Sequence, residues 1–210
     1  MTSLYARGMS RTLLLALLLV VLGGCVATRP DNPRNVCSMF EERRSWFRAA
    51  EQAEEHWGVP VPVTMAFIYQ ESSFQARARP PRGRLLGFIP WLRPSSARGY
   101  AQALDITWNE YKEQTGNRLG MRSHFPDAVD FIGWYNRNSV QRNGIAAHDA
   151  RNLYLAYHEG NGGYARGTWR DKPWLIETAG RVQANADRYA EQYSQCRGEL
   201  ARPWWQRIFF

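Results

Sequence analysis

The chain has few of the residues on which metal and thiol chemistry depends. Its 210 residues include 3 cysteines and 4 histidines, and the histidines show no metal-ligand spacing: His56, His124, His148 and His158. A glycine-rich phosphate loop is missing, and so is the Gly-x-Ser-x-Gly turn that carries a nucleophilic serine. We therefore expect no metal and no cofactor, and chemistry performed by ordinary side chains.

The sequence also lacks sustained alternation of apolar and polar residues, which would predict strands, and it has no internal repeat. Helical spacing is present in several segments instead. These predicted helices are 38–57, 62–73, 105–115, 126–142, 147–158 and 173–195. Residues 75–98 contain 4 prolines and 6 arginines without any period, which predicts a long loop, either solvated or folded over the domain. The prediction is a mainly α single domain with a long loop in place of any substantial sheet.

The N-terminal segment is typical of an export signal. Arg7 and Arg11 precede an unbroken apolar run, Leu13 to Leu22, which is too short to span a membrane comfortably. The run ends in Leu-Gly-Gly-Cys at Cys25, which resembles a bacterial lipobox, where the cysteine is lipidated and the preceding residues are removed. The alternative is an ordinary secretory signal that leaves Cys25 as a free thiol.

The lipobox resemblance implies a particular organisation and location. Residues 1–24 are then a signal peptide of the lipoprotein type, and residues 25–36 are a lipidated tether to the membrane. Val26 rather than aspartate follows the cysteine, which favours an outer-membrane anchor facing the periplasm. Removing Arg7 and Arg11 lowers the formal charge from +8 by two, to +6. In this compartment the anionic partners are peptidoglycan and lipid headgroups, so we expect no nucleic acid. Protein partners are not indicated.

Export also affects how the two other cysteines are interpreted. Cys37 and Cys196 lie at the two ends of the globular region, residues 37–198. In an oxidising periplasm this pair predicts a disulfide between the first and last helices, and two separate buried thiols are the alternative. Residues 199–210 form an aromatic tail that either packs on the domain or meets a membrane interface.

Three short motifs follow one another along the globular region. The first, Glu71-Ser72-Ser73-Phe74, comes directly after the apolar run VTMAFIYQ. A carboxylate beside apolar residues either finds a cationic partner or keeps its proton and serves as an acid. The second motif is Gly99-Tyr100-Ala101-Gln102, and the third is Ala156-Tyr157-His158-Glu159-Gly160.

The order of these motifs resembles that of the lytic transglycosylases of the lysozyme-like superfamily. Their pattern is E-S-x-F, then G-L-M-Q, then A-Y-N before a glycine, and the likeness covers about residues 58–195. Tyr100 and Ala101 depart from the usual Leu-Met, and His158 stands in place of Asn. The resemblance implies a lysozyme-like domain that cleaves the glycan strands of peptidoglycan at the bond between N-acetylmuramic acid and N-acetylglucosamine.

The resemblance also implies a role for Glu71. This residue protonates the glycosidic oxygen and then acts as base, so that the muramic C6 hydroxyl closes a 1,6-anhydro ring. An apolar pocket, with Ile68 and Phe74 as candidate walls, would raise the pKa of Glu71 toward neutrality. The alternative is an ion pair with an arginine of residues 77–84, which would lower that pKa. The family often has a tyrosine in its last helix that bonds the acid, and Tyr189 and Tyr193 are the candidates.

Several other residues are expected to contact the sugar or to pack in the core. The expected substrate-binding residues are Ser72, Tyr100, Gln102, Tyr157, His158 and Glu159. Core packing is the alternative for Tyr157, and it is the expectation for Trp108 and Trp134. Glu159 is either a solvent-facing residue at a helix end or a second carboxylate that positions a water. The alternative functions are accordingly a hydrolytic muramidase on the same fold and a non-catalytic lipoprotein that binds peptidoglycan as a scaffold.

Overall fold

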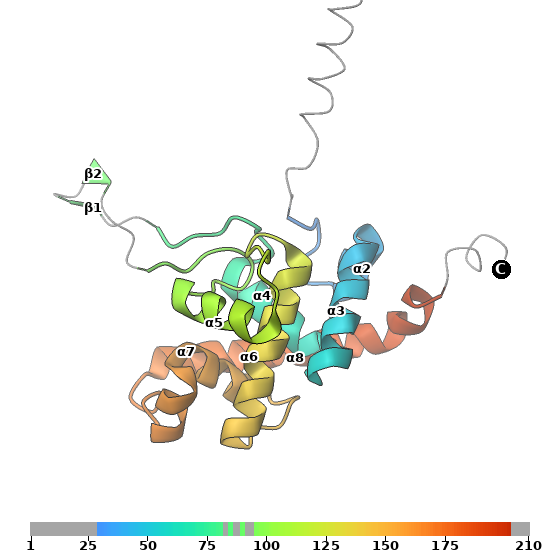
Figure 1. Cartoon of the computed structure of the whole chain (residues 1–210). Coiled ribbons are helices and arrows are strands. Elements are labelled where there is room, and N and C mark those ends of the chain that lie inside the picture. Colours follow the sequence, from blue (N-terminus) through green and yellow to red (C-terminus); the bar gives the residue numbers. More distant parts are fainter. Residues whose placement is uncertain (1–28, 82–83, 86–88, 91–94, 203–210) are drawn as a thin grey trace, which may run out of the picture.

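The computed structural model describes residues 29–81, 84–85, 89–90 and 95–202, and its body is a bundle of α-helices (Figure 1). In chain order the elements are α2 (Val36–Glu42), α3 (Arg44–Trp57), α4 (Val61–Ser72), β1 (Arg84–Leu85), β2 (Ile89–Pro90), α5 (Asp105–Thr115), α6 (Phe125–Asn143), α7 (Ala150–Arg166) and α8 (Pro173–Leu200). The prediction of a mainly α fold is confirmed. The signal peptide 1–24, Cys25 and residues 203–210 of the aromatic tail lie outside the described residues.

Helix α4 is the centre of the bundle and packs against α3, α6, α7 and α8. Every residue from Val61 to Ile68 is buried, as expected for a helix that is apolar on all sides. Pro62 stands in its first turn, where a missing backbone N–H costs nothing, and Ser73 ends it in the left-handed conformation. The helix therefore runs through the core and places Glu71 in its last turn.

The segment predicted as one helix over 38–57 is two helices that meet at Arg43. Arg43 has φ −134° and ψ 75°, and neither proline nor glycine marks this break in the sequence. The cause is tertiary, because α2 is held to α8 rather than continuing α3. A disulfide joins Cys37 to Cys196, which confirms the predicted pairing. The backbone N–H of Val36 also donates to Oε1 of Gln192, 3.0 Å away.

Part of the predicted tether packs on the domain instead of extending from it. The hydroxyl of Tyr189 donates to the carbonyl of Pro33 at 2.5 Å, and Nε of Arg34 donates to the hydroxyl of Tyr69 at 3.3 Å. At the other end, α8 continues past residue 198 to Leu200, which is buried. The helical domain is therefore longer at both ends than the sequence pattern predicted. No helix in the described part of the chain has the length and apolarity to cross a bilayer.

The loop over 75–98 contains the whole of the described sheet. β1 and β2 pair antiparallel, with Leu85 opposite Ile89, and project away from the helical body (Figure 1). The prediction of a long loop in place of a substantial sheet is thus confirmed.

Aromatic residues fill the core of the helical body: Trp46 stacks on Phe125 with ring centroids 3.8 Å apart. Trp108 and Trp134 are buried, as predicted.

Candidate active site

A cleft of about 740 Å³ lies beside the C-terminal end of α4 and brings the three motifs together. Its lining includes Glu71 from the first motif, Gln102 from the second, and Tyr157 and His158 from the third. These residues are separated by up to 87 positions in the sequence, between Glu71 and His158. The convergence expected from the order of the motifs is therefore present in the fold.

The backbone turns sharply directly after Glu71. Ser73 and Phe74 have φ values of 49° and 62°, a left-handed conformation that is uncommon for residues other than glycine. Strained backbone of this kind is concentrated at functional sites. Ser72 does not point its hydroxyl at the cleft, because this group is buried and donates to the carbonyl of Ile68 at 3.1 Å. The Ser72 hydroxyl is therefore engaged by the end of the helix, while the residue borders a depression next to the cleft, and its expected sugar contact stays a prediction.

The carboxyl group of Glu71 holds its proton far more tightly than a solvated glutamate. Burial disfavours the charged form and raises the pKa of Glu71 to about 7, although a hydrogen bond from the Tyr154 hydroxyl partly opposes the shift. The negative end of the α4 dipole acts in the same direction as burial. Among the described residues no arginine forms an ion pair with Glu71, so the pairing considered from the sequence does not occur there.

The apolar walls of the cleft differ from those expected. Ile68 and Phe74 are fully buried in the core and do not line the cleft. Aromatic residues of α6 and α7 form the walls instead: Phe131, Tyr135, Tyr154 and Tyr157. Of these residues only Tyr157 was expected at the site, because Phe131, Tyr135 and Tyr154 lie far from Glu71 in the sequence and outside the three motifs.

The tyrosine that bonds Glu71 comes from α7 and not from the last helix. Tyr154 makes this contact, whereas the hydroxyls of Tyr189 and Tyr193 bond to Pro33 and Glu51. The expectation of a partner in the last helix was wrong for the described structure. A sequence signal for Tyr154 did exist, since it precedes Tyr157 by three residues and therefore shares its helix face.

The second motif forms a tight loop whose glycine is required by geometry. Gly99 has φ +78°, and a Cβ at this position would lie 2.1 Å from the carbonyl oxygen of Arg122. Gln102 turns its amide nitrogen inward, where it donates to the carbonyls of Ala78 and Gly99 at 3.0 and 2.7 Å. Its amide oxygen has no hydrogen-bond partner among the described residues, and the residue lines the cleft.

Tyr100 was expected to contact substrate, and the structure places it in the core instead. Its side chain is 2 % exposed and packs edge-on against both Trp46 and Phe125, at 5.7 and 5.5 Å between ring centroids. The backbone bond from Tyr100 N–H to the Arg122 carbonyl fixes this inward direction. The aromatic residue in the second motif therefore anchors the loop that positions Gln102.

Tyr157 combines the two roles that the sequence left open, a structural contact and a place in the cleft. Its hydroxyl donates to the carbonyl of Ala101 at 2.5 Å, which joins the third motif to the second, while its ring remains in the wall of the cleft. His158 is more exposed, and its ring meets Trp174 edge-on at 5.1 Å. Trp174 also lines the cleft and is 55 % exposed. The sequence pattern did not predict this exposed aromatic surface.

Glu159 lies in the cleft lining but is fully engaged by neighbours. Its carboxylate forms a 2.7 Å salt bridge with Lys172, accepts a hydrogen bond from Thr168, and lies 3.1 Å from Nδ1 of His158. These hydrogen bonds, with that from Lys172 the largest cause, lower the pKa of Glu159 to about 2. The adjacent Gly160 has φ 73° and ψ 154°, which breaks α7 directly after this residue.

A helical domain with a carboxyl group of raised pKa in an aromatic cleft is typical of enzymes that cleave glycosidic bonds on a lysozyme-like fold. The family described as Transglycosylase SLT domain matches residues 13–196, so the chain belongs to this family and is a peptidoglycan lytic transglycosylase. No curated protein and no solved structure matches the chain. The family predicted from the three motifs is confirmed.

Proposed function

We propose that the enzyme cleaves the β-1,4 bond between N-acetylmuramic acid and N-acetylglucosamine without water, with Glu71 as the only acid and base. The observation that carries the proposal is the raised pKa of Glu71, about 7, in a cleft lined by the other two motifs. With this pKa about half of the Glu71 carboxyl groups hold a proton at neutral pH and can donate it to the leaving oxygen, whereas an ordinary glutamate is almost fully ionised.

The reaction then proceeds in two proton transfers through one residue. Protonated Glu71 gives its proton to the glycosidic oxygen as the bond to muramic C1 breaks, and the substrate's own N-acetyl group stabilises the developing positive charge. The resulting Glu71 carboxylate removes the proton from the C6 hydroxyl, whose oxygen attacks C1. The products are a new N-acetylglucosamine end and a 1,6-anhydromuramyl end, and Glu71 regains its proton.

The state of Glu159 favours this route over hydrolysis. A second carboxylate that activates a water needs an accessible oxygen that can accept a proton near neutral pH. Glu159 has a pKa of about 2, and its oxygens are held by Lys172 and Thr168. We infer that Glu159 positions Lys172 and His158 beside the cleft and does not act as a second base.

Product analysis of intact sacculi tests the proposal. Digestion in water labelled with a heavy oxygen isotope is expected to yield fragments that lack a reducing end, are lighter by one water than hydrolysis products, and contain no label. Fragments with labelled reducing ends would show that water was the acceptor. The enzyme would then be a muramidase on the same fold.

Tyr154 provides a prediction about pH dependence. Replacing Tyr154 by phenylalanine removes the donor that stabilises the Glu71 carboxylate, so the pKa of Glu71 is expected to rise further. The alkaline limb of the pH–rate profile should therefore move to higher pH, and the maximal rate should fall roughly tenfold because the base form loses a hydrogen bond to a charged group. Tyr164→Phe, on the same helix but outside the cleft, is the matched control. An unmoved alkaline limb in Tyr154→Phe would contradict the assigned role.

We also propose that the enzyme is located at the outer membrane. The apolar run from Leu13 to Leu22, the following Cys25 and Val26 support a lipoprotein anchored in the outer membrane and facing the periplasm. The Cys37–Cys196 disulfide supports an oxidising compartment. Incorporation of labelled fatty acid into the chain, and its loss in Cys25→Ala, is the expected result. Equal labelling of both proteins would contradict the anchor.

A further inference from the structure

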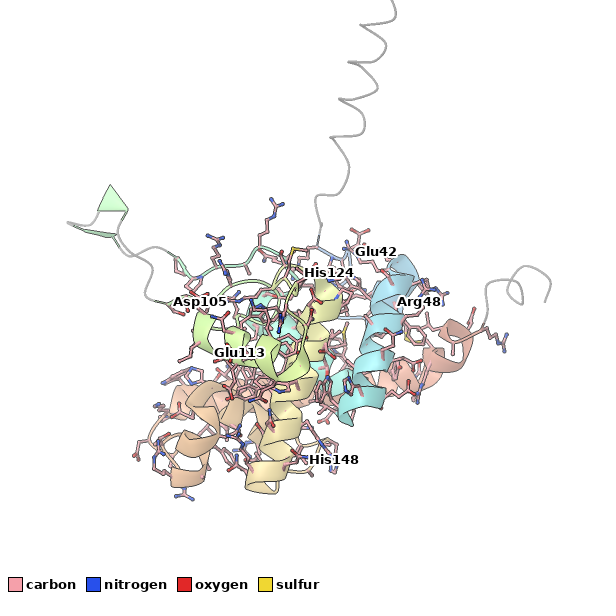
Figure 2. The ribbon with its side chains drawn as sticks, viewed as in Figure 1. Glu42, Arg48, Asp105, Glu113, His124 and His148 are labelled. Atoms are coloured by element: carbon pink, nitrogen blue, oxygen red, sulfur yellow. A yellow bond between two sulfur atoms is a disulfide. The ribbon has the colours of Figure 1, made fainter. Side chains whose placement is uncertain are left out.

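A second hollow, of about 730 Å³, is lined by an excess of positive charge. It lies between residues 76–79, the start of the second motif, helix α5 and residues 120–123. We call this feature the basic hollow. Its charged residues are Arg77, Arg79, Arg98, Asp105, Lys112 and Arg122. Five cationic side chains thus face a single carboxylate. Figure 2 shows Asp105 at the start of α5, where this region begins.

The single carboxylate does not neutralise the hollow. Asp105 is already paired with Arg122 at 2.6 Å and lies 3.6 Å from Arg98, and the hydrogen bond from Arg122 lowers the pKa of Asp105. Arg77, Arg79 and Lys112 have no ion-pair partner among the described residues. Their charges therefore remain available to an anion that enters the hollow.

Arg122 contributes a donor that the protein leaves unused. Its side chain is only 5 % exposed, and its terminal nitrogens donate to the carbonyls of Ser96 and Ala103 and to Asp105. Its Nε is buried without a hydrogen-bond partner in the part of the chain that the structure describes. A buried, unpaired N–H is costly, and the positive charge of this side chain adds to the potential that an anion in the hollow would meet.

The basic hollow is connected to Glu71 by a third depression of about 630 Å³. This depression shares Gln70, Glu71 and Gln102 with the cleft, and it shares Arg77 and Arg79 with the basic hollow. The three hollows therefore border one another, with the third depression between the cleft and the basic hollow, so a substrate bound at Glu71 has a path toward the basic hollow.

The chemistry of peptidoglycan identifies which part of the substrate fits there. In an intact strand the lactyl carboxyl group of each muramic residue is held in the amide bond to its peptide, so the glycan itself has no charge to pair with Arg77, Arg79 and Lys112. The short peptide attached to each muramic residue carries carboxylates, and it branches from the sugar whose bond is broken. We propose that the basic hollow binds the carboxylates of this stem peptide, an inference that rests on the proposed function because it extends the site around Glu71.

The proposal predicts a preference for strands that keep their peptides. The rate of glycan cleavage should be measured on intact sacculi and on the same strands after an amidase has removed the peptides and the lactyl carboxylates that this exposes have been converted to neutral amides. The triple variant Arg77→Gln, Arg79→Gln, Lys112→Gln is expected to lower the ratio of these two rates by about tenfold, since charge-assisted contacts to carboxylates are lost. The ratio cancels any general effect of the substitutions on Glu71.

A matched control uses arginines remote from the groove. Arg48 on α3 and Arg151 on α7 are exposed and line none of the three hollows, and Figure 2 shows Arg48 on a different side of the molecule from Asp105. The double variant Arg48→Gln, Arg151→Gln is expected to keep the wild-type ratio. A similar fall in this control would mean that overall charge, and not the hollow, sets the preference, and it would overturn the proposal.

A second measurement needs no variant and covers the case in which the triple variant does not fold. Free stem tetrapeptide is expected to inhibit cleavage by the wild-type enzyme, and the same peptide with amidated carboxyl groups is expected to inhibit at least tenfold less. Equal inhibition by both peptides would overturn the proposal. Inhibition by inorganic phosphate at the concentration of the peptide, with an unchanged rate ratio in the triple variant, would show a phosphate site and would also overturn it. Failure of the proposed function would appear separately, as reducing ends on the products of either substrate.

Discussion

Replacement of Glu71 by glutamine is expected to reduce the release of fragments from sacculi by roughly 10³-fold or more, since in the proposed mechanism one side chain supplies both the acid and the base. Glutamine preserves the size of the side chain but can neither donate a proton to the glycosidic oxygen nor accept one from the C6 hydroxyl. The measurement is the initial rate of soluble muropeptide release at neutral pH. An unchanged rate would remove the enzymatic role of Glu71.

The same variant provides its own control for folding. Because burial raises the pKa of Glu71 from an ordinary 4.5 to about 7, the wild-type protein loses stability as the pH rises between these two values. Glutamine does not ionise, so Glu71→Gln is expected to exceed the wild type at pH 8 by up to about 3 kcal/mol in free energy of unfolding, and to match it at low pH. An inactive variant that is also less stable at pH 8 would point to misfolding instead.

Removal of the disulfide is expected to have the largest effect on stability. Cys37 and Cys196 are separated by 159 residues, and closing so long a loop contributes about 5 kcal/mol in the chain-entropy model. The variant Cys37→Ser, Cys196→Ser should therefore lose most of this amount in urea unfolding, and reduction of the wild-type protein should give a similar loss. A change below about 1 kcal/mol would show that contacts between α2 and α8 suffice without the bond.

The parts of the fold that could be predicted follow from local pattern. Apolar spacing and helix-starting residues indicated most of the helices, and α5 begins and ends at the predicted residues 105 and 115. The apolar run before Glu71 predicted a helix over 62–73 with this residue near its end, and α4 is buried and has Glu71 in its last turn. The disulfide followed from the positions of Cys37 and Cys196 at the two ends of the domain.

The parts that could not be predicted depend on tertiary contacts. Tyr100 lies in a motif associated with the site, yet the loop turns its ring into the core between Trp46 and Phe125. The break at Arg43 has no local signal because it is set by the attachment of α2 to α8. Trp174 reaches the cleft because α8 begins beside it, and a single tryptophan in the first turn of a helix does not reveal such a position.

The different roles of the two glutamates also could not be predicted from the sequence. Glu71 and Glu159 each follow an apolar helical run, and the sequence left both open as acids. The structure separates them: burial near Tyr154 raises the pKa of Glu71, whereas Lys172 and Thr168 lower that of Glu159. Neither Tyr154 nor Lys172 is adjacent to its glutamate in the sequence, so the assignment depended on packing that no short motif encodes.

The most direct test of the account is an NMR titration of the Glu71 carboxyl group in enzyme labelled at its glutamate carboxyl carbons. The Glu71 signal is assigned as the one that is missing in Glu71→Gln. The proposed mechanism requires that this group titrates with a pKa of about 7. A pKa near the ordinary value of 4.5 would mean that Glu71 is ionised at neutral pH, and it would contradict a mechanism in which this residue alone supplies the proton.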